Sequence, residues 1–191
     1  MFNDSLLYAT VAALLILALG WGIGTLAVME DPTLGEDLMQ TLNQEVFGKI
    51  LDDNQIILSF NLFLNNLEAS IILFLGGATF GVLTLIVLST NGIVIGMVIE
   101  VLREQQGLLY ILAGVIPHGI FEIPAFVISG GLGLLLAEEL LREARGKGDA
   151  AEKAKDYSIV FLKAVIPLLA IAAFVEGFIT PEIINLVVLG V

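Results

Sequence analysis

One short stretch of this chain places the residue types that most often carry chemistry inside otherwise apolar sequence. The run Pro117-His118-Gly119-Ile120-Phe121-Glu122-Ile123-Pro124 holds the only histidine of the 191 residues and an acid four positions after it. Residues four apart lie on the same face of a helix, so His118 and Glu122 should face the same way. Ionisable side chains at membrane depth are costly, and they are usually buried, paired and functional. We therefore expect the chemistry of this protein to lie at His118 and Glu122.

Other polar residues stand within or beside apolar stretches and complete a candidate intramembrane cluster: Asn65, Asn66, Glu68, Asn91 and Glu176. Three roles are open for this cluster. It could be a hydrogen-bonded knot that fixes the register of the helices, a path for a proton or an ion, or a metal or hydrolytic site. One histidine with carboxylates can bind a metal, yet no zinc motif with two histidines is present. No catalytic residue, metal ligand or cofactor is therefore assigned.

A second group of candidate residues consists of glycines suited to close helix packing: Gly77, Gly81, Gly92, Gly96, Gly130 and Gly131. The first four form two pairs with glycine-x-x-x-glycine spacing, which Gly20 and Gly24 repeat. In lipid, small residues let helix backbones approach closely. The pattern indicates either contact between helices of one chain or a homo-oligomer interface.

The elements that must position these residues are membrane-spanning helices. Hydrophobic residues make up 58% of the chain and its mean hydropathy is +0.98, whereas globular domains are roughly 45–50% apolar. A spanning helix needs about 20 mostly apolar residues, and four stretches qualify, near residues 6–29, 67–89, 117–137 and 159–176. The first has no basic n-region and is longer than a signal-peptide core, so we expect it to be a retained span. The predicted fold class is all-α, a polytopic transmembrane helical bundle that forms a single integral membrane domain over residues 1–191.

Residues 92–116 are expected to form a fifth, irregular span. Two apolar runs flank Arg103-Glu104-Gln105-Gln106, and at 1.5 Å per residue neither run crosses a bilayer of roughly 30 Å by itself. They either join as one broken crossing, which we prefer, or form a re-entrant hairpin with a polar tip. In both cases we expect a helix discontinuity between Arg103 and Gly107, with Arg103 paired to an acid or a carbonyl.

Two shorter segments flank these spans. Residues 55–66 mix apolar and polar positions at helical spacing, so they either lie at the membrane interface or extend the second span. Thr180-Pro181-Glu182 has the composition of a helix start, with a threonine cap followed by proline and an acid. The remainder to Val191 is too short to span, and we expect a short C-terminal interfacial helix there.

Charge is distributed unevenly along the chain. The net charge is −12 and the pI is near 4.2, which argues against nucleic-acid binding, because that requires a basic surface. Five of the eight basic residues fall between Arg142 and Lys155, whereas residues 30–54 contain seven acids and one lysine. Because basic loops stay in the cytoplasm, we expect the loop Glu138–Asp156 and the N-terminus inside and the acidic loop outside.

Several of these motifs together are similar to a known family. They are Asn65-Asn66 before a glycine-rich span, Asn91-Gly92 with Gly96, Pro117-His118-Gly119 with Glu122 and Pro124, Gly130-Gly131 with Gly133, and Glu176-Gly177-Phe178 with Thr180-Pro181. With these motifs in this order, the chain resembles the stage II sporulation protein M family of integral membrane proteins. The resemblance covers roughly residues 60–181 and implies a polytopic α-helical protein. In endospore-forming bacteria the family's namesake acts in a membrane complex with peptidoglycan-degrading partners.

The residues and the resemblance together predict a scaffold or remodelling component of a larger complex, crossing the cell membrane several times. Its expected partners are the lipid bilayer, further copies of itself and other membrane proteins, but no nucleic acid. The rival hypothesis is a transporter or channel that moves a proton, an ion or a small solute through a site around His118 and Glu122. An intramembrane metalloenzyme is a more distant alternative, so we do not expect an enzyme.

The predicted topology can be tested by thiol labelling because the chain contains no cysteine. We expect Gly148→Cys, in the basic loop, to react with a membrane-impermeant thiol reagent only after the cells are lysed, since this loop should face the cytoplasm. As a control, Gln40→Cys in the acidic segment should react in intact cells. Labelling of Gly148→Cys that is as strong in intact as in lysed cells would reverse the orientation.

Overall fold

The computed structural model describes residues 4–44 and 54–189, and every regular element in these ranges is helical. Residues 45–53 of the acidic segment and the last two residues of the chain lie outside the described residues. Four long helices are α1 (Asp4–Glu30), α4 (Gln55–Leu75), α5 (Val82–Gln106) and α6 (Leu108–Ala144). The fifth is a continuous helical column of α7 (Ala150–Val160), η3 (Phe161–Val165), α8 (Ile166–Phe174) and η4 (Val175–Ile179), in which η3 and η4 are π-helical. The short elements are α2 (Pro32–Leu42), the 3₁₀ helix η2 (Gly76–Thr79), α9 (Thr180–Ile184) and η5 (Asn185–Leu189).

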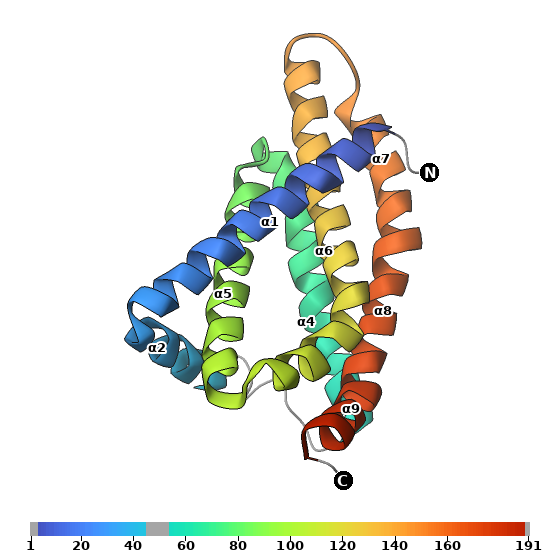
Figure 1. The fold of residues 1–191 in the computed structure, drawn as a ribbon. Coiled ribbons are helices and arrows are strands. Elements are labelled where there is room, and N and C mark those ends of the chain that lie inside the picture. The colour runs from blue at the N-terminus through green and yellow to red at the C-terminus, as the bar shows by residue number, and fades with distance from the viewer. Residues whose placement is uncertain (1–3, 45–53, 190–191) are drawn as a thin grey trace.

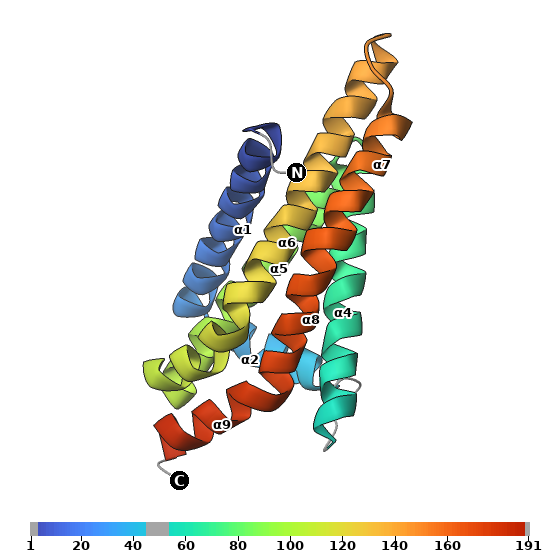
Figure 2. The ribbon, with the colours of Figure 1, turned by 90° about the vertical axis from the view of Figure 1, so that its right-hand side faces the viewer.

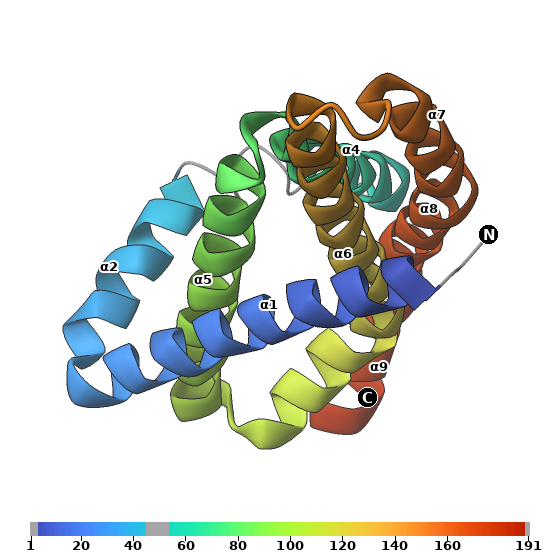
Figure 3. The ribbon, with the colours of Figure 1, turned by 90° about the horizontal axis from the view of Figure 1, so that it is seen from above.

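The long helices run alternately between two ends of the bundle (Figures 1 and 2). The N-terminus and the loop between α6 and α7 lie at one end, and α2, the α5–α6 connection and α9 lie at the other. Figure 3 shows α1 crossing over α5 and α6, both of which it contacts. α6 occupies the centre, because it contacts α1, α4, α5, α7 and α8.

Five helical segments are long and apolar enough to span a membrane: Asp4–Glu30, Gln55–Thr79, Val82–Gln106, Leu108–Ala144 and Ala150–Val187. The predicted all-α bundle with five such helices is therefore confirmed. The outward faces of these helices are apolar. Leu15, Leu19 and Leu26 of α1, for example, are 59%, 69% and 60% exposed, which suits a surface in contact with lipid.

The expected boundaries of the second and third spans differ from those in the structure. The apolar run 67–89 is not one helix, because a tight turn between α4 and α5 divides it. Phe80 and Gly81 adopt left-handed backbone conformations in this turn, with φ of 55° and 83°, and Leu83 N donates to Thr79 Oγ1 at 2.9 Å. The turn contains neither proline nor charge, so the apolar run conceals it. Residues 55–66 consequently extend the second helix, which was one of the two alternatives for that segment.

The irregular stretch at residues 92–116 is shared between two helices. Residues 92–106 complete α5, and Gly107 interrupts the helix with φ of 85°, a conformation that glycine adopts at little cost. Residues 108–116 then begin α6, so the stretch is neither a re-entrant hairpin nor a crossing of its own. The predicted discontinuity between Arg103 and Gly107 is confirmed.

α6 changes direction along its length. Its first part runs across the end of the bundle, and the helix then turns to run alongside α8 (Figures 1 and 2). Pro117 and Pro124 lie inside α6, and an internal proline removes a backbone hydrogen bond and kinks a helix. We attribute the bend to these prolines.

The C-terminal helix begins without the expected threonine cap. η4 runs directly into α9, and no side chain caps that helix. Thr180 is 3% exposed, and within the described part of the chain its Oγ1 has no hydrogen-bond partner. The physical reason is that the preceding residues are already helical, so the first N–H groups of α9 have carbonyl partners and need no cap.

Glycines bring the backbones of α1 and α5 into direct contact. A Cβ atom built on Gly24 would lie 2.0 Å from the carbonyl oxygen of Ile93, and one built on Gly96 would lie 2.1 Å from that of Trp21. Thr25 Oγ1 adds a hydrogen bond of 3.3 Å to the carbonyl of Gly96. The same contact involves Gly20 and Gly92, whose added Cβ atoms would lie 2.7 Å and 2.4 Å from backbone oxygens. Any larger side chain here would push the two helices apart.

A second glycine layer joins α6 to its neighbours. A Cβ on Gly133 would lie 2.3 Å from the carbonyl oxygen of Leu73 in α4, and one on Gly77 would lie 2.2 Å from the carbonyl oxygen of Gly133. Gly130 faces α5 and α1, and Gly131 faces α1, with added Cβ atoms 2.9–3.2 Å from their neighbours. These glycines pack against other helices of the same chain, so they lend no support to a homo-oligomer interface.

The two glycine pairs of α1 and α5 allow a matched test of close packing. Gly24→Ala should lower the free energy of unfolding by about 1–3 kcal/mol, because overpacking of a tight contact costs this much. Gly22→Ala on the same helix should be neutral or slightly stabilising, since nothing lies within 4 Å of its added Cβ and alanine favours helix. Thermal unfolding of the two detergent-solubilised variants measures the difference. Equal unfolding temperatures for both variants would contradict the packing.

Candidate functional site

The candidate site lies where α6, α4 and η4 come together. His118 and Glu122 are one helical turn apart on α6, and His118 Nε2 lies 4.0 Å from Glu122 Oε2. His118 Nδ1 is in close contact with Oε2 of Glu176 on η4. The side chain of Asn66, on α4, is a hydrogen-bond partner of Glu122. Three helices that are far apart in sequence are thus tied together by four polar side chains.

The local sequence of α6 explains why this polar site forms here. Pro117 precedes His118 and Pro124 follows Glu122. Because proline has no N–H, Pro124 leaves the carbonyl of Ile120 without its usual helical donor. The two prolines also turn the helix, and the bend brings its histidine face towards α4 and η4.

A recess of about 190 Å³ adjoins the four side chains. Leu62, Ala172 and Ala173 complete its walls. The side chain of His118 is 18% exposed, and those of Glu122 and Glu176 are 35% and 33% exposed. The cluster therefore has room beside it for water or for one small group, and its carboxylates are not sealed off.

The comparisons with known proteins place the chain in a family. The family described as Stage II sporulation protein M matches residues 12–181. The chain belongs to the Stage II sporulation protein M family. A curated relative, an uncharacterized protein of Methanocaldococcus jannaschii, is 37% identical over 123 residues, which cover 62% of this chain and 68% of the relative. No solved structure matches the chain.

Family membership and the five apolar helices identify this Stage II sporulation protein M family member as a membrane protein. Of the polar residues singled out from its sequence, the structure brings together Asn66, His118, Glu122 and Glu176. Asn65 is exposed beside them, with its Nδ2 donating to Asn66 Oδ1 at 3.5 Å.

The other two polar candidates lie apart from this cluster. Glu68 is exposed on α4. Asn91 donates from Nδ2 to the carbonyl of Val87 in its own helix at 2.8 Å, which satisfies the amide locally. Within the described part of the chain, no three or more histidine and acidic side chains are arranged to hold a metal ion. Nothing in the geometry therefore favours the metalloenzyme alternative.

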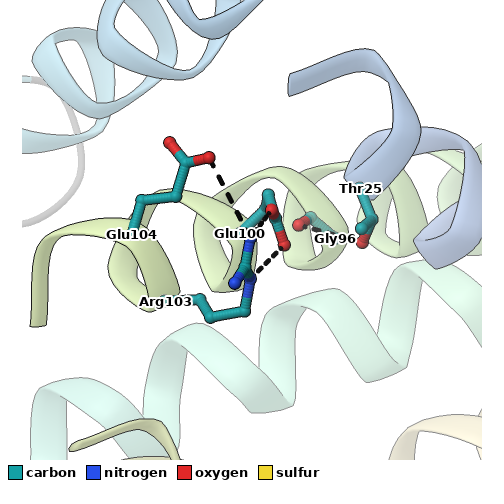
Figure 4. A network of polar contacts seen from close by, with 5 residues as sticks. All are labelled: Thr25, Gly96, Glu100, Arg103 and Glu104. Carbon is teal, nitrogen blue, oxygen red and sulfur yellow. Dashed lines mark hydrogen bonds and ion pairs between the residues drawn. The ribbon is translucent and has the colours of Figure 1, made fainter. Parts of the chain in front are cut away.

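A second polar group in this protein lies at the end of α5 (Figure 4). Glu100 is 4% exposed, and Arg103 donates to its carboxylate from Nε at 2.9 Å and from a terminal guanidinium nitrogen at 2.5 Å. Glu104 lies 4.0 Å from the same guanidinium. The predicted acid partner of Arg103 is confirmed, but Glu100 was not among the candidates. Its spacing of three residues from Arg103 on one helix was the available signal.

The contact between His118 and Glu176 can be tested with a double-mutant cycle. We expect His118→Ala to lower the free energy of unfolding by about 1–3 kcal/mol, because it leaves the Glu176 carboxylate without its partner in a poorly solvated place. His118→Gln, which keeps hydrogen-bonding ability, should cost less. Adding Glu176→Gln to His118→Ala should cost little more than the single change, with a coupling of about 0.5–3 kcal/mol.

The measurement is thermal or denaturant unfolding of the detergent-solubilised variants. Glu68→Gln is the control, since this exposed glutamate lies one turn or less from Asn65-Asn66 but outside the cluster. Strict additivity of His118→Ala and Glu176→Gln would show that the two side chains do not act as a pair.

Proposed function

We propose that this protein is a scaffold component of a larger complex in the cell membrane, crossing the bilayer five times with its N-terminus in the cytoplasm. The observation that carries the proposal is the pairing of His118, Glu122, Glu176 and Asn66 across three helices. These side chains contact one another, and in doing so they fix α4, α6 and η4 in one arrangement. A polar knot of this kind gives a helical bundle a unique register.

The packing on the proposed cytoplasmic side of the cluster favours a rigid bundle and argues against a channel. Gly130, Gly131 and Gly133 follow Glu122 along α6 and lie against the backbones or side chains of α1, α4 and α5. A gap too small for a single Cβ atom leaves no space for water. On the side of α8, Ala125, Leu132 and Leu169 are fully buried in one apolar cluster, so a solute that reached the recess would meet packed side chains before it reached the cytoplasm.

The depth of the cluster fits an anchoring point in the outer half of the membrane. Glu122 lies 15 residues before Ala137, the last apolar residue ahead of Glu138-Glu139, which is about 22 Å along an α-helix. Paired charges at such depth are costly to disrupt, so the cluster holds the outer half of the bundle as the glycine layer holds the inner half.

The family supports a scaffold in a complex. The family is named after a sporulation protein. The resemblance implies that this namesake acts in a membrane complex with peptidoglycan-degrading partners. Neither the family description nor the relative from Methanocaldococcus jannaschii names an enzymatic activity, and we propose that the chain is not an enzyme. We also propose that it assembles with other membrane proteins or with copies of itself, through surfaces other than its packing glycines.

A transporter is the second candidate function, and one observation favours it. Glu122 and Glu176 are each about one-third exposed beside a recess of about 190 Å³. Two carboxylates face a single imidazole there, so acceptor oxygens line the recess as a proton or cation path would require. Transport would require the glycine layer to open.

The two functions give opposite results in vesicles and in native membranes. As a scaffold, the protein reconstituted in liposomes should pass no more protons than empty liposomes, measured with an enclosed pH-sensitive dye under an imposed pH gradient. Protein extracted from its own membranes in mild detergent should migrate well above the 20.4 kDa protomer with a second membrane protein in fixed ratio. The variant His118→Ala should lose that assembly, whereas Glu68→Gln should keep it.

The opposite result has two parts: the liposomes show a proton flux that Glu122→Gln abolishes, and the extracted protein remains monomeric. Together these would overturn the scaffold proposal and establish a transporter.

A further inference from the structure

A cavity of about 500 Å³ lies at the end of the bundle opposite the polar cluster. It is bounded by the start of α1, the last turns of α6 and the first turns of α7. Its volume falls within the range of about 300–1,000 Å³ that is typical of small-molecule sites. Because it is separate from the proposed scaffold function and its residues, its role has to be argued from its own chemistry.

The loop between α6 and α7 sets the shape of this cavity. Glu143 reaches across the loop and accepts a hydrogen bond of 3.0 Å from the backbone N–H of Ala150. Asp149 caps α7 by accepting from Glu152 N at 2.9 Å. Gly146 and Gly148 supply the positive φ angles, 72° and 110°, that this tight turn needs. The loop therefore holds α7 firmly across from α6.

Acidic and basic side chains both line the cavity. Glu138 and Glu139 on α6 and Asp156 on α7 supply three carboxylates, and Arg142 and Lys153 supply two cations. Arg142 lies 3.4 Å from Glu139 Oε1, and Lys153 lies 3.6 Å from Asp156. These are long contacts between side chains that are about half exposed on the basic side. The cations are therefore free to turn towards a ligand at little cost.

Glu139 is the exception among these charges, because it is only 8% exposed. Its ion pair within the described part of the chain is the long one that its Oε1 makes with Arg142 at 3.4 Å, which leaves acceptor sites of the carboxylate available. Gly148 passes close to Glu139 Oε2, which would lie 3.3 Å from a Cβ at that position. A carboxylate that is this little exposed and is held by one long contact can accept further hydrogen bonds from a cationic or hydrogen-donating group in the cavity.

The floor of the cavity is apolar. Leu6, Leu135 and Val160 are each at most 7% exposed there, and Ile159 and Tyr157 continue the wall. Tyr157 lies in the electrostatic field of Glu139, Glu138 and Asp156, and tyrosine is enriched at membrane–water boundaries. The cavity thus joins a charged rim to an apolar floor at the level where the apolar sequence of α6 ends and that of the fifth column begins in α7.

We propose that this cavity binds the phosphoethanolamine group of an amine-bearing zwitterionic phospholipid from the cytoplasmic leaflet. The primary ammonium would donate to Glu139 Oε2 and to Glu138 or Asp156. The phosphate would lie against Arg142 and Lys153, which present N–H donors to anionic oxygens. The start of the acyl chains would cover Leu6 and Leu135. An anionic headgroup without an amine offers no cation to the carboxylates, and a quaternary ammonium has no N–H group to donate to them.

Binding of defined lipids to the purified full-length protein tests the proposal. Native mass spectrometry in detergent would compare dioleoyl phosphatidylethanolamine with the phosphatidylcholine and phosphatidylglycerol of the same acyl chains. We expect the ethanolamine lipid to bind at least tenfold more tightly than either. Glu139→Gln should reduce that preference tenfold or more, and the exposed variant Glu138→Gln should reduce it in the same direction. Glu152→Gln, an acid of α7 that does not line the cavity, should leave it unchanged.

Water-soluble glycerophosphoethanolamine separates the two sources of the same chemistry. Binding of this soluble headgroup far weaker than that of the lipid assigns the site to a membrane lipid, and equal binding assigns it to a soluble phosphoethanolamine ester. Equal affinity for the ethanolamine, choline and glycerol lipids would overturn the proposal. So would an ethanolamine preference that survives both Glu139→Gln and Glu138→Gln in variants that unfold at the temperature of the unmodified protein.

Discussion

The direct backbone contact between helices is the constraint on which the rest of this structure depends. In lipid no hydrophobic effect drives helices together, so association relies on close van der Waals approach and on polar contacts. Gly24 and Gly96 allow that approach between α1 and α5, and Gly77 and Gly133 allow it between η2 and α6. Because α6 lies at the centre, these contacts fix the position of the helix that carries His118 and Glu122. A methyl group at any of the four glycines would displace the site.

Once the helices are close, unpaired polar groups become expensive, and this cost determines where the polar residues lie. His118 meets Glu176 and lies near Glu122, while Glu100 holds Arg103 with two short hydrogen bonds. Both groups lie towards the same end of the bundle, the end that we propose to be external. The opposite end is different, because its charges surround a cavity and are paired only by long contacts. The two ends of the bundle therefore differ in how their charges are paired, closely at one end and by long contacts at the other.

Hydropathy and residue spacing predicted the class of fold and the meeting of the main polar residues, and they failed where the chain turns without a polar signal. His118, Glu122 and Glu176 could be associated because each is an ionisable residue in an apolar helix, where only pairing makes it tolerable. The turn at Gly76–Gly81 could not be found in this way, since glycine, alanine, threonine and phenylalanine also occur inside spans. Glu100 escaped notice for a related reason, because its partner is on its own helix and its burial arises from the packing of α1 and α2 against α5.

The fifth helical column links the two ends. It contains two π-helical segments, Phe161–Val165 and Val175–Ile179. The first begins directly after Val160, which lines the cavity between α6 and α7, and the second contains Glu176 of the polar cluster. A π-turn adds a residue to the helical repeat, shifts the face that follows it, and often occurs at functional sites. The first π-helical segment lies between Tyr157 and Glu176, and the second contains Glu176. The angle between these two side chains around the column therefore differs from the angle in a regular α-helix. With this angle, Tyr157 faces the cavity and Glu176 faces His118.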